Sequence, residues 1–171
     1  AAPARTVGTR TIALVVAAAL FMENIDSTIL STALPTIATD LNVNPLSLKL
    51  ALTSYLISLA IFIPPSGWVA DRFGARRVFA AAVLVFMAGS LACTTVSTLE
   101  GFVVARFLQG IGGAMMVPVG RLIVARNTPK QGFVSAMAWL TMPALLGPVL
   151  GPLVGGIIVT NYPWHWIFLI N

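Results

Sequence analysis

Residues 11–38 read TIALVVAAALFMENIDSTILSTALPTIA, a run that is almost entirely apolar and has only two charged side chains, Glu23 and Asp26. A helix needs about 20 apolar residues to cross about 30 Å of hydrocarbon, and this run is longer than that. The segment therefore predicts a membrane-spanning helix with two carboxyl groups inside the bilayer.

The rest of the chain has the same character. Of its 171 residues, 58% are hydrophobic and 9% are charged, and the mean hydropathy is +0.94. One soluble globule could not bury this much apolar surface. The short polar and apolar alternation of a β-barrel strand is absent, so we expect an all-α integral membrane protein.

Apolar runs divide the chain into a predicted tail, residues 1–10, and one transmembrane domain, residues 11–171. The predicted spans are residues 11–38, 45–69, 78–96, 101–124 and 133–160, and a sixth begins at residues 164–171. We expect Pro35 and the following residues 39–45, TDLNVNP, to mark the exit of the first span and the turn before the second. Pro64 and Pro65 should kink or unwind the second span near its end.

Basic residues indicate the topology. Those in the connections on the side of the N-terminus are Arg5, Arg10, Arg72, Arg76, Arg77, Arg126 and Lys130, and only Lys49 falls opposite. This asymmetry predicts a cytoplasmic N-terminus. The net charge of +5 is spread over short clusters between apolar runs, so we expect no nucleic-acid partner.

Glu23 and Asp26 should lie roughly 18 Å and 22 Å from the cytoplasmic end of the first span, on one helical face. Charge at that depth requires a polar cavity or a partner, although a carboxyl group could also stay protonated and serve packing alone. Arg106 in the fourth span falls at a similar depth, which makes it a candidate partner for Asp26. Its alternative is to snorkel to the outer interface, and Arg121 is expected to snorkel to the inner one.

A second charged feature is residues 67–77, GWVADRFGARR, which we expect to form a loop between the second and third spans. Gly67 and Gly74 would permit tight turns and close approach. Asp71 stands among Arg72, Arg76 and Arg77. Such a dense charge set predicts either a network at a moving interface or a solvated loop that only sets topology.

Three motifs carry a family resemblance. The charged loop matches GxLaDrxGrk at Gly67, Asp71, Arg72, Gly74 and Arg76, with departures at Val69 and Ala75. The fourth span matches RxxqGxg at Arg106, Gln109, Gly110 and Gly112. The fifth span contains GPVLGPLVGG, which matches GxxxGPxxGG at Gly147, Gly151, Pro152, Gly155 and Gly156. The ordered set resembles the major facilitator superfamily.

Two further stretches narrow the resemblance. Residues 25–35, IDSTILSTALP, and residues 164–171, WHWIFLIN, are similar to segments of the fourteen-span drug:proton antiporters of the EmrB/QacA type. The resemblance implies the N-terminal part of a proton-coupled exporter of drugs or metabolites in a bacterial inner membrane. An uptake symporter of the same fold and a non-transporting membrane interaction protein are the alternatives.

The resemblance also implies roles for the residues. Asp26, Glu23 and Arg106 would couple protons to substrate, and Asp71 would latch the two halves of the transporter on the cytoplasmic side. The expected partners are the lipid bilayer, lipophilic substrates that include cations, and the C-terminal half. The proton is the expected coupling ion, with no cofactor.

Enzymatic chemistry is not indicated. The sequence has no nucleotide-binding loop, no metal-ligand cluster and no nucleophile paired with a base. The single histidine, His165, lies between two tryptophans and is expected to be an interfacial anchor, while Cys93 in an apolar run should be a small packing residue.

Overall fold

The computed structural model describes residues 9–171, and this part of the chain is helical with no strand. Six α-helices, one short 3₁₀-helix and a final helical turn follow in the order α1 (Thr9–Asp40), α2 (Pro45–Phe62), α3 (Ser66–Phe73), α4 (Ala75–Thr95), α5 (Leu99–Asn127), η1 (Lys130–Gly132), α6 (Phe133–Asn161) and α7 (Trp166–Leu169).

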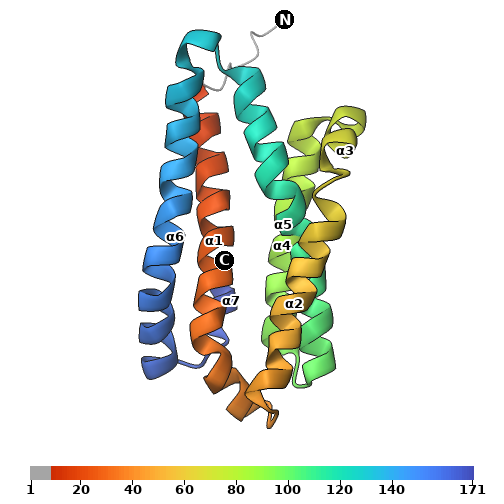
Figure 1. The fold of residues 1–171 in the computed structure, drawn as a ribbon, viewed down its shortest axis with the longest axis vertical. Helices are drawn as coiled ribbons and strands as arrows, with labels where there is room; N and C mark the ends of the chain where they lie inside the picture. Colours follow the sequence, from red (N-terminus) through yellow and green to blue (C-terminus); the bar gives the residue numbers. More distant parts are fainter. Residues whose placement is uncertain (1–8) are drawn as a thin grey trace, which may run out of the picture.

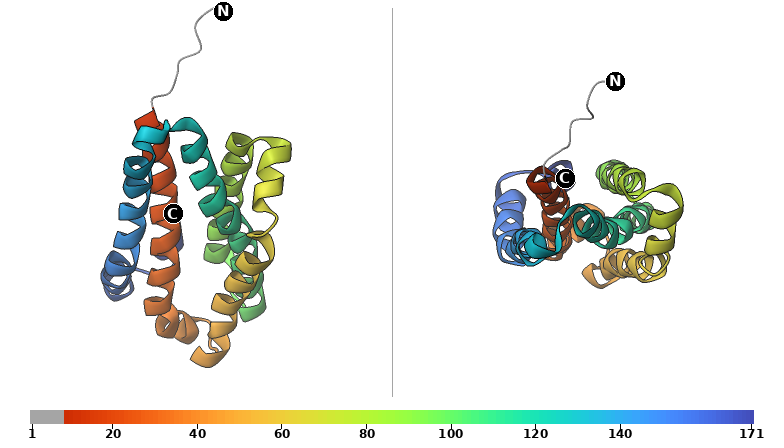
Figure 2. Two further views of the ribbon diagram at one scale, coloured as in Figure 1. Left: turned by 45° about the horizontal axis from the view of Figure 1, so that its top comes forward. Right: turned by 90° about the horizontal axis from the view of Figure 1, so that it is seen from above.

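The long helices form two groups. Helices α1 and α6 pack along each other, while α5 packs against both α4 and α2. Figure 1 shows the two groups side by side, and the view from above in Figure 2 shows α5 nearest to α1. The site described below lies where α1 faces α5.

Five helical segments are long and apolar enough to cross a membrane: Thr11–Asp40, Pro45–Phe62, Ala75–Thr95, Leu99–Asn127 and Lys130–Asn161. The α3–α4 junction and the α5–α6 connection lie at one end of the bundle (Figure 1). We call this the basic end, because Arg72, Arg76, Arg77, Arg126 and Lys130 lie in these segments. Arg5 lies outside the described residues. The cytoplasmic location of the basic end remains a prediction.

The predicted unwinding at Pro64 and Pro65 is confirmed, but the predicted extension of the second span to residue 69 is wrong. Helix α2 ends at Phe62, and after a turn at residues 63–65 the separate helix α3 begins at Ser66. Pro64 and Pro65 have no amide N–H to continue the α2 ladder. The Ser66 hydroxyl instead donates to the Ile63 carbonyl at 2.6 Å.

The prediction that residues 67–77 form a loop is also wrong. Asp71 and Arg72 lie in the last turn of α3, Arg76 and Arg77 lie in the first turn of α4, and one residue, Gly74, separates the two helices. Gly74 has φ of 88°. A side chain would be strained at that angle, so glycine is required at this junction.

Pro35 does not end α1, which continues to Asp40. The Thr39 hydroxyl donates to the Pro35 carbonyl at 2.9 Å within this last part of the helix. The turn follows at residues 41–44, within the predicted TDLNVNP segment. Asn42 has a positive φ of 52° there, and the Asn44 side chain caps α2 by accepting from the Leu46 N–H at 2.8 Å. The remaining helix ends differ from the predicted span limits by three residues or fewer.

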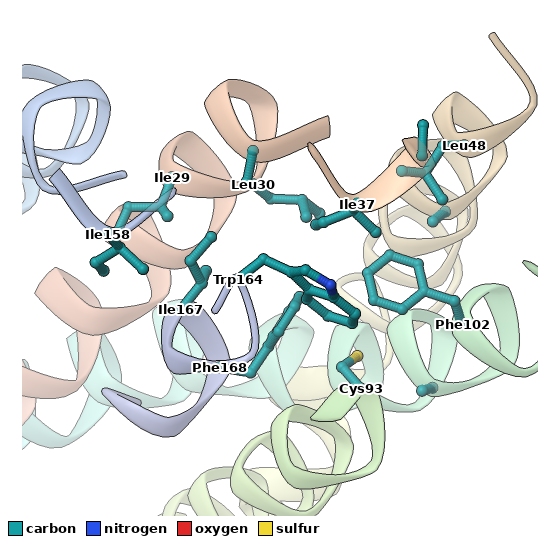
Figure 3. Packing of buried hydrophobic residues seen from close by; sticks show 14 of the residues in the cluster. Ile29, Leu30, Ile37, Leu48, Cys93, Phe102, Ile158, Trp164, Ile167 and Phe168 are labelled. Atoms are coloured by element: carbon teal, nitrogen blue, oxygen red, sulfur yellow. The ribbon is translucent and has the colours of Figure 1, made fainter. Parts of the chain in front are cut away.

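Two apolar clusters build the interior. One surrounds Phe102, Trp164 and Phe168 at the end opposite the basic end, and Figure 3 shows these rings beside Cys93 and Ile37. The other contains Val16 of α1 and Met116 of α5.

A polar layer separates the two clusters. On α1, Glu23 and Asp26 lie between the residues of the Val16 cluster and most residues of the Phe102 cluster. On α5, Arg106 and Gln109 also lie between the two clusters. All four side chains are buried.

Candidate functional site

An ion pair occupies the centre of the polar layer. The Arg106 guanidinium Nη1 lies 2.7 Å from Asp26 Oδ2, and both side chains have 0% exposure. The predicted pairing of Asp26 with Arg106 is confirmed, and snorkelling of Arg106 is excluded for this conformation. A buried arginine cannot discharge by deprotonation, so the carboxylate is its natural counter-ion.

Two amide side chains complete the surroundings of Asp26. Gln109 Nε2 donates to Asp26 Oδ1 at 3.0 Å, and Asn171 Nδ2 donates to the same oxygen at 2.7 Å. The Gln109 Oε1 atom accepts from Arg106 Nη1 at 2.6 Å, which orients its amide toward Asp26. Every donor in this set favours the ionised carboxylate.

Arg106 itself is incompletely satisfied. Its Nε and Nη2 groups have no hydrogen-bond partner within the described residues. The Tyr55 ring lies under the guanidinium, 4.5 Å from ring centroid to Cζ, and the Phe168 ring lies 5.9 Å away. These rings stabilise the cation but accept no conventional hydrogen bond, so the guanidinium has capacity for a further acceptor.

Glu23 has a different environment from Asp26. It is 7% exposed, and its Oε1 lies 3.5 Å from the Tyr55 hydroxyl, which is a long and weak hydrogen bond. Its Oε2 has no partner within the described part of the chain. A buried carboxyl group with an unmet oxygen is suited to bind a proton or a cation.

Glycines of α5 make room for this layer. A Cβ atom at Gly113 would lie 2.8 Å from the Tyr55 hydroxyl, and one at Gly110 would lie 2.7 Å from Ser58 Cβ. A Cβ atom at Gly112 would instead meet the α4 backbone at Ala82 and Phe86. The glycines of this motif therefore bring α5 close to both α2 and α4.

The C-terminal segment contributes to the layer from a third direction. Ser90 of α4 donates to the Phe168 carbonyl at 2.9 Å, and Asn171 Nδ2 donates to Ser90 Oγ at 3.0 Å. Farther out, Trp164 Nε1 donates to Asp40 Oδ2 at 2.8 Å. His165 stacks on Trp164 with ring centroids 3.8 Å apart, away from the ion pair.

The charged residues of the α3–α4 junction include one ion pair to a third helix. Asp71 Oδ1 pairs with Arg126 Nη2 of α5 at 2.7 Å, and not with its neighbouring arginines. The Arg72 guanidinium lies 6.0 Å from the Trp68 ring. Arg126 was predicted only as a topology residue, because sequence distance concealed that α5 ends beside α3.

The glycines of the fifth-span motif divide into two sets. A Cβ atom at Gly147, Gly151 or Gly155 would collide with or press on α1, whereas one at Gly156 would meet nothing within 4 Å. Close approach at Gly156 is therefore not observed, and Gly67 is likewise open. Pro152, the other residue of the motif, lies exposed within α6.

Sequence reasoning missed Tyr55, Ser90 and Asn171. Each is a polar side chain inside or beside an apolar run, and a buried hydroxyl or amide needs a hydrogen-bond partner. That signal marks them as candidates. It does not reveal which carboxyl group they face, because their partners lie on distant helices.

Five membrane-length helices and a buried ion pair between α1 and α5 are typical of a multi-pass helical membrane protein. The sequence model of the Major Facilitator Superfamily matches residues 16–171. The chain belongs to this superfamily. With its spans, that membership makes it a multi-pass inner membrane protein.

Relatives with the name MdtD, which are named for multidrug resistance, match most of the chain. The MdtD protein of Klebsiella pneumoniae strain 342 is 50% identical over 157 residues, which are 92% of this chain and 33% of the relative. Those of Pectobacterium atrosepticum and Yersinia pestis are each 48% identical over 92% of this chain and 34% of the relative. The chain thus spans about a third of the length of these relatives.

Proposed function

We propose that the chain is the N-terminal part of a proton-coupled exporter of lipophilic small molecules, including cationic ones. The observation that carries this proposal is Asp26, a fully buried carboxylate paired with Arg106 beside a second buried carboxyl group, Glu23. The names of the MdtD relatives support multidrug substrates.

Asp26 is the proposed proton-coupling residue. Low dielectric disfavours its charge, while Arg106 and two amide donors favour it. A change in the distance between α1 and α5 would alter this balance, so the carboxyl group would take up or release a proton as the site faces each side of the membrane.

Glu23 is the proposed contact for cationic substrates. It is held only weakly by Tyr55, and one of its oxygens lacks a partner within residues 9–171. A cation that approaches Glu23 would also favour loss of the proton from Asp26, because both carboxyl groups lie on one face of α1. Substrate and proton would therefore compete without occupying the same atoms.

The α3–α4 junction is the proposed contact with the C-terminal half. Gly67 leaves open space on α3, and the Asp71–Arg126 pair is exposed, at 53% for the arginine and 64% for the aspartate. A second helical half could approach here and exchange partners with Asp71. We propose no covalent chemistry and no cofactor other than the transported proton.

The test is transport by the full-length protein in liposomes with an imposed pH gradient. Export predicts that a fluorescent lipophilic cation moves against the direction of proton flow. Movement of the cation with the protons would establish the uptake symporter instead, and absence of gradient-dependent movement would favour a non-transporting membrane protein.

A further inference from the structure

We infer that Asn171 is a positioning residue for the Asp26 carboxylate, and that with Ser90 it links the segment after α6 to the protonation of that carboxylate. The inference deepens the proposed function, because it rests on the role of Asp26 as the coupling residue. Asn171 belongs to the stretch 164–171 that narrowed the family resemblance, and the resemblance assigned it no role.

The hydrogen-bond directions around Asn171 are mutually consistent. Its amide nitrogen has two N–H groups, and it donates to Asp26 Oδ1 at 2.7 Å and to Ser90 Oγ at 3.0 Å. The Ser90 hydroxyl in turn donates a hydrogen bond to the Phe168 carbonyl at 2.9 Å. Asp26 on α1, Ser90 on α4 and the segment of Phe168 and Asn171 are thereby joined in one chain of donors and acceptors.

Asn171 also decides where a proton can be placed on Asp26. Oδ1 accepts from both Gln109 and Asn171, so both of its lone-pair sites are occupied. Oδ2 accepts only from Arg106 among the described residues. Protonation at Oδ1 must displace an amide, and protonation at Oδ2 must weaken the ion pair. The Asn171 amide therefore stabilises the charged form and opposes proton uptake.

Other titratable groups face Asp26 from the surrounding helices. Arg106 of α5 favours its charge, and Glu23 on α1 itself opposes that charge. Tyr55 of α2 and Cys93 of α4 are the other titratable side chains close to this set, and both are neutral while a carboxyl group titrates. The neutral amide of Asn171 adds no charge to this set, so its removal tests a hydrogen bond alone.

A second contact provides a control. Trp164 Nε1 donates to Asp40 Oδ2 and holds the same connection at the end of the bundle, but it does not touch Asp26. Trp164→Phe removes this bond while leaving an aromatic ring in the apolar cluster. Asn161→Ala removes an exposed amide that donates only to its own helix, at the Ile157 carbonyl.

The experiment is an infrared pH titration of the purified full-length protein, in which the carbonyl band of protonated Asp26 is identified by its loss in Asp26→Asn. In Asn171→Ala the midpoint should move upward by about one pH unit, because a bond to the charged form is lost. Asn171→Leu, which keeps the side-chain volume, should move it in the same direction. Ser90→Ala should move it less, since Ser90 acts only through Asn171.

An unchanged midpoint in both Asn171 variants would overturn the inference. An equal shift of the midpoint in Trp164→Phe would also overturn the inference. The cause would then be the position of the C-terminal segment and not the Asn171 amide. The titration does not depend on transport. If Asp26→Asn retains proton-coupled efflux, the proposed function fails, while the infrared midpoint still decides the role of Asn171.

Discussion

Asp26 and Arg106 are 80 positions apart in the sequence, yet their charged groups meet at 2.7 Å with neither side chain exposed. The contact joins α1 to α5, the helix of the other group that lies nearest to α1 in the view from above (Figure 2). Any movement of one group relative to the other changes the surroundings of both charges.

The ion pair leads to a stability prediction. Asp26→Leu leaves the Arg106 charge buried without its counter-ion, so we expect a loss of about 3–5 kcal/mol. The double variant Asp26→Leu with Arg106→Leu removes both charges and should be more stable than Asp26→Leu alone. Thermal unfolding of the full-length protein in detergent measures the double variant and the two single variants, Asp26→Leu and Arg106→Leu. A double variant that loses the sum of the two single losses would show that the charges do not interact.

Glu23→Gln should selectively weaken the binding of cationic substrates. The substitution keeps the shape of the side chain and removes its charge, so we expect affinity for a lipophilic cation to fall about tenfold, or about 1.4 kcal/mol. A neutral substrate of similar size should keep its affinity within about twofold, because the side chain at residue 23 keeps its volume. Equal losses for both substrates would assign Glu23 a packing role.

Asp71→Asn should change the transport cycle more than the fold. The Asp71–Arg126 pair is more than half exposed, so its loss should cost about 0–1 kcal/mol of stability. We expect turnover to fall by about fivefold or more with little change in equilibrium drug affinity.

Arg126→Gln breaks the same pair and should reproduce this result, whereas Arg121→Gln, at an exposed arginine of α5, is the control. A large loss of affinity with normal turnover in Asp71→Asn would place Asp71 in substrate binding.

The α1–α6 contact leads to a packing prediction. A methyl group at Gly151 would collide with the Thr28 side chain, whereas one at Gly156 would meet nothing. Gly151→Ala should therefore lower stability by about 1–3 kcal/mol through overpacking. Gly156→Ala should be neutral or slightly stabilising, because alanine favours the helix. Equal unfolding temperatures for the two variants would show that α1 and α6 can move apart to accommodate the methyl group without loss of stability.

The fold was predictable to the extent that it depends on local sequence. The length of the apolar runs predicted the spans, and the charged residues at positions 23 and 26 predicted which face of α1 is buried. Depth counting also placed Arg106 level with Asp26, because helices rise by a fixed amount per residue. The break at Pro64 and Pro65 was anticipated as a kink, but a full new helix up to Phe73 was not.

The missing parts of the site depend on packing between distant helices. The position of Tyr55 within a span indicates that its hydroxyl needs a partner but not which partner, and Arg126 resembles any basic residue at a span end. Their partners are set by which helices become neighbours, α2 with α5 and α3 with α5. The sequence shows that Asn171 is polar but not that it donates a hydrogen bond to Asp26, because the position of Asn171 depends on the path of the chain after α6.

The central claim is that Asp26 carries the coupled proton, and drug-induced proton release from the detergent-solubilised full-length protein tests it most directly. A lipophilic cation added to the wild type in weakly buffered solution should release protons, and addition to Asp26→Asn should release none while Glu23→Gln still responds at higher drug concentration. Release from Asp26→Asn equal to that from the wild type would contradict the account, and the buried pair with Arg106 would then serve the packing of α1 on α5.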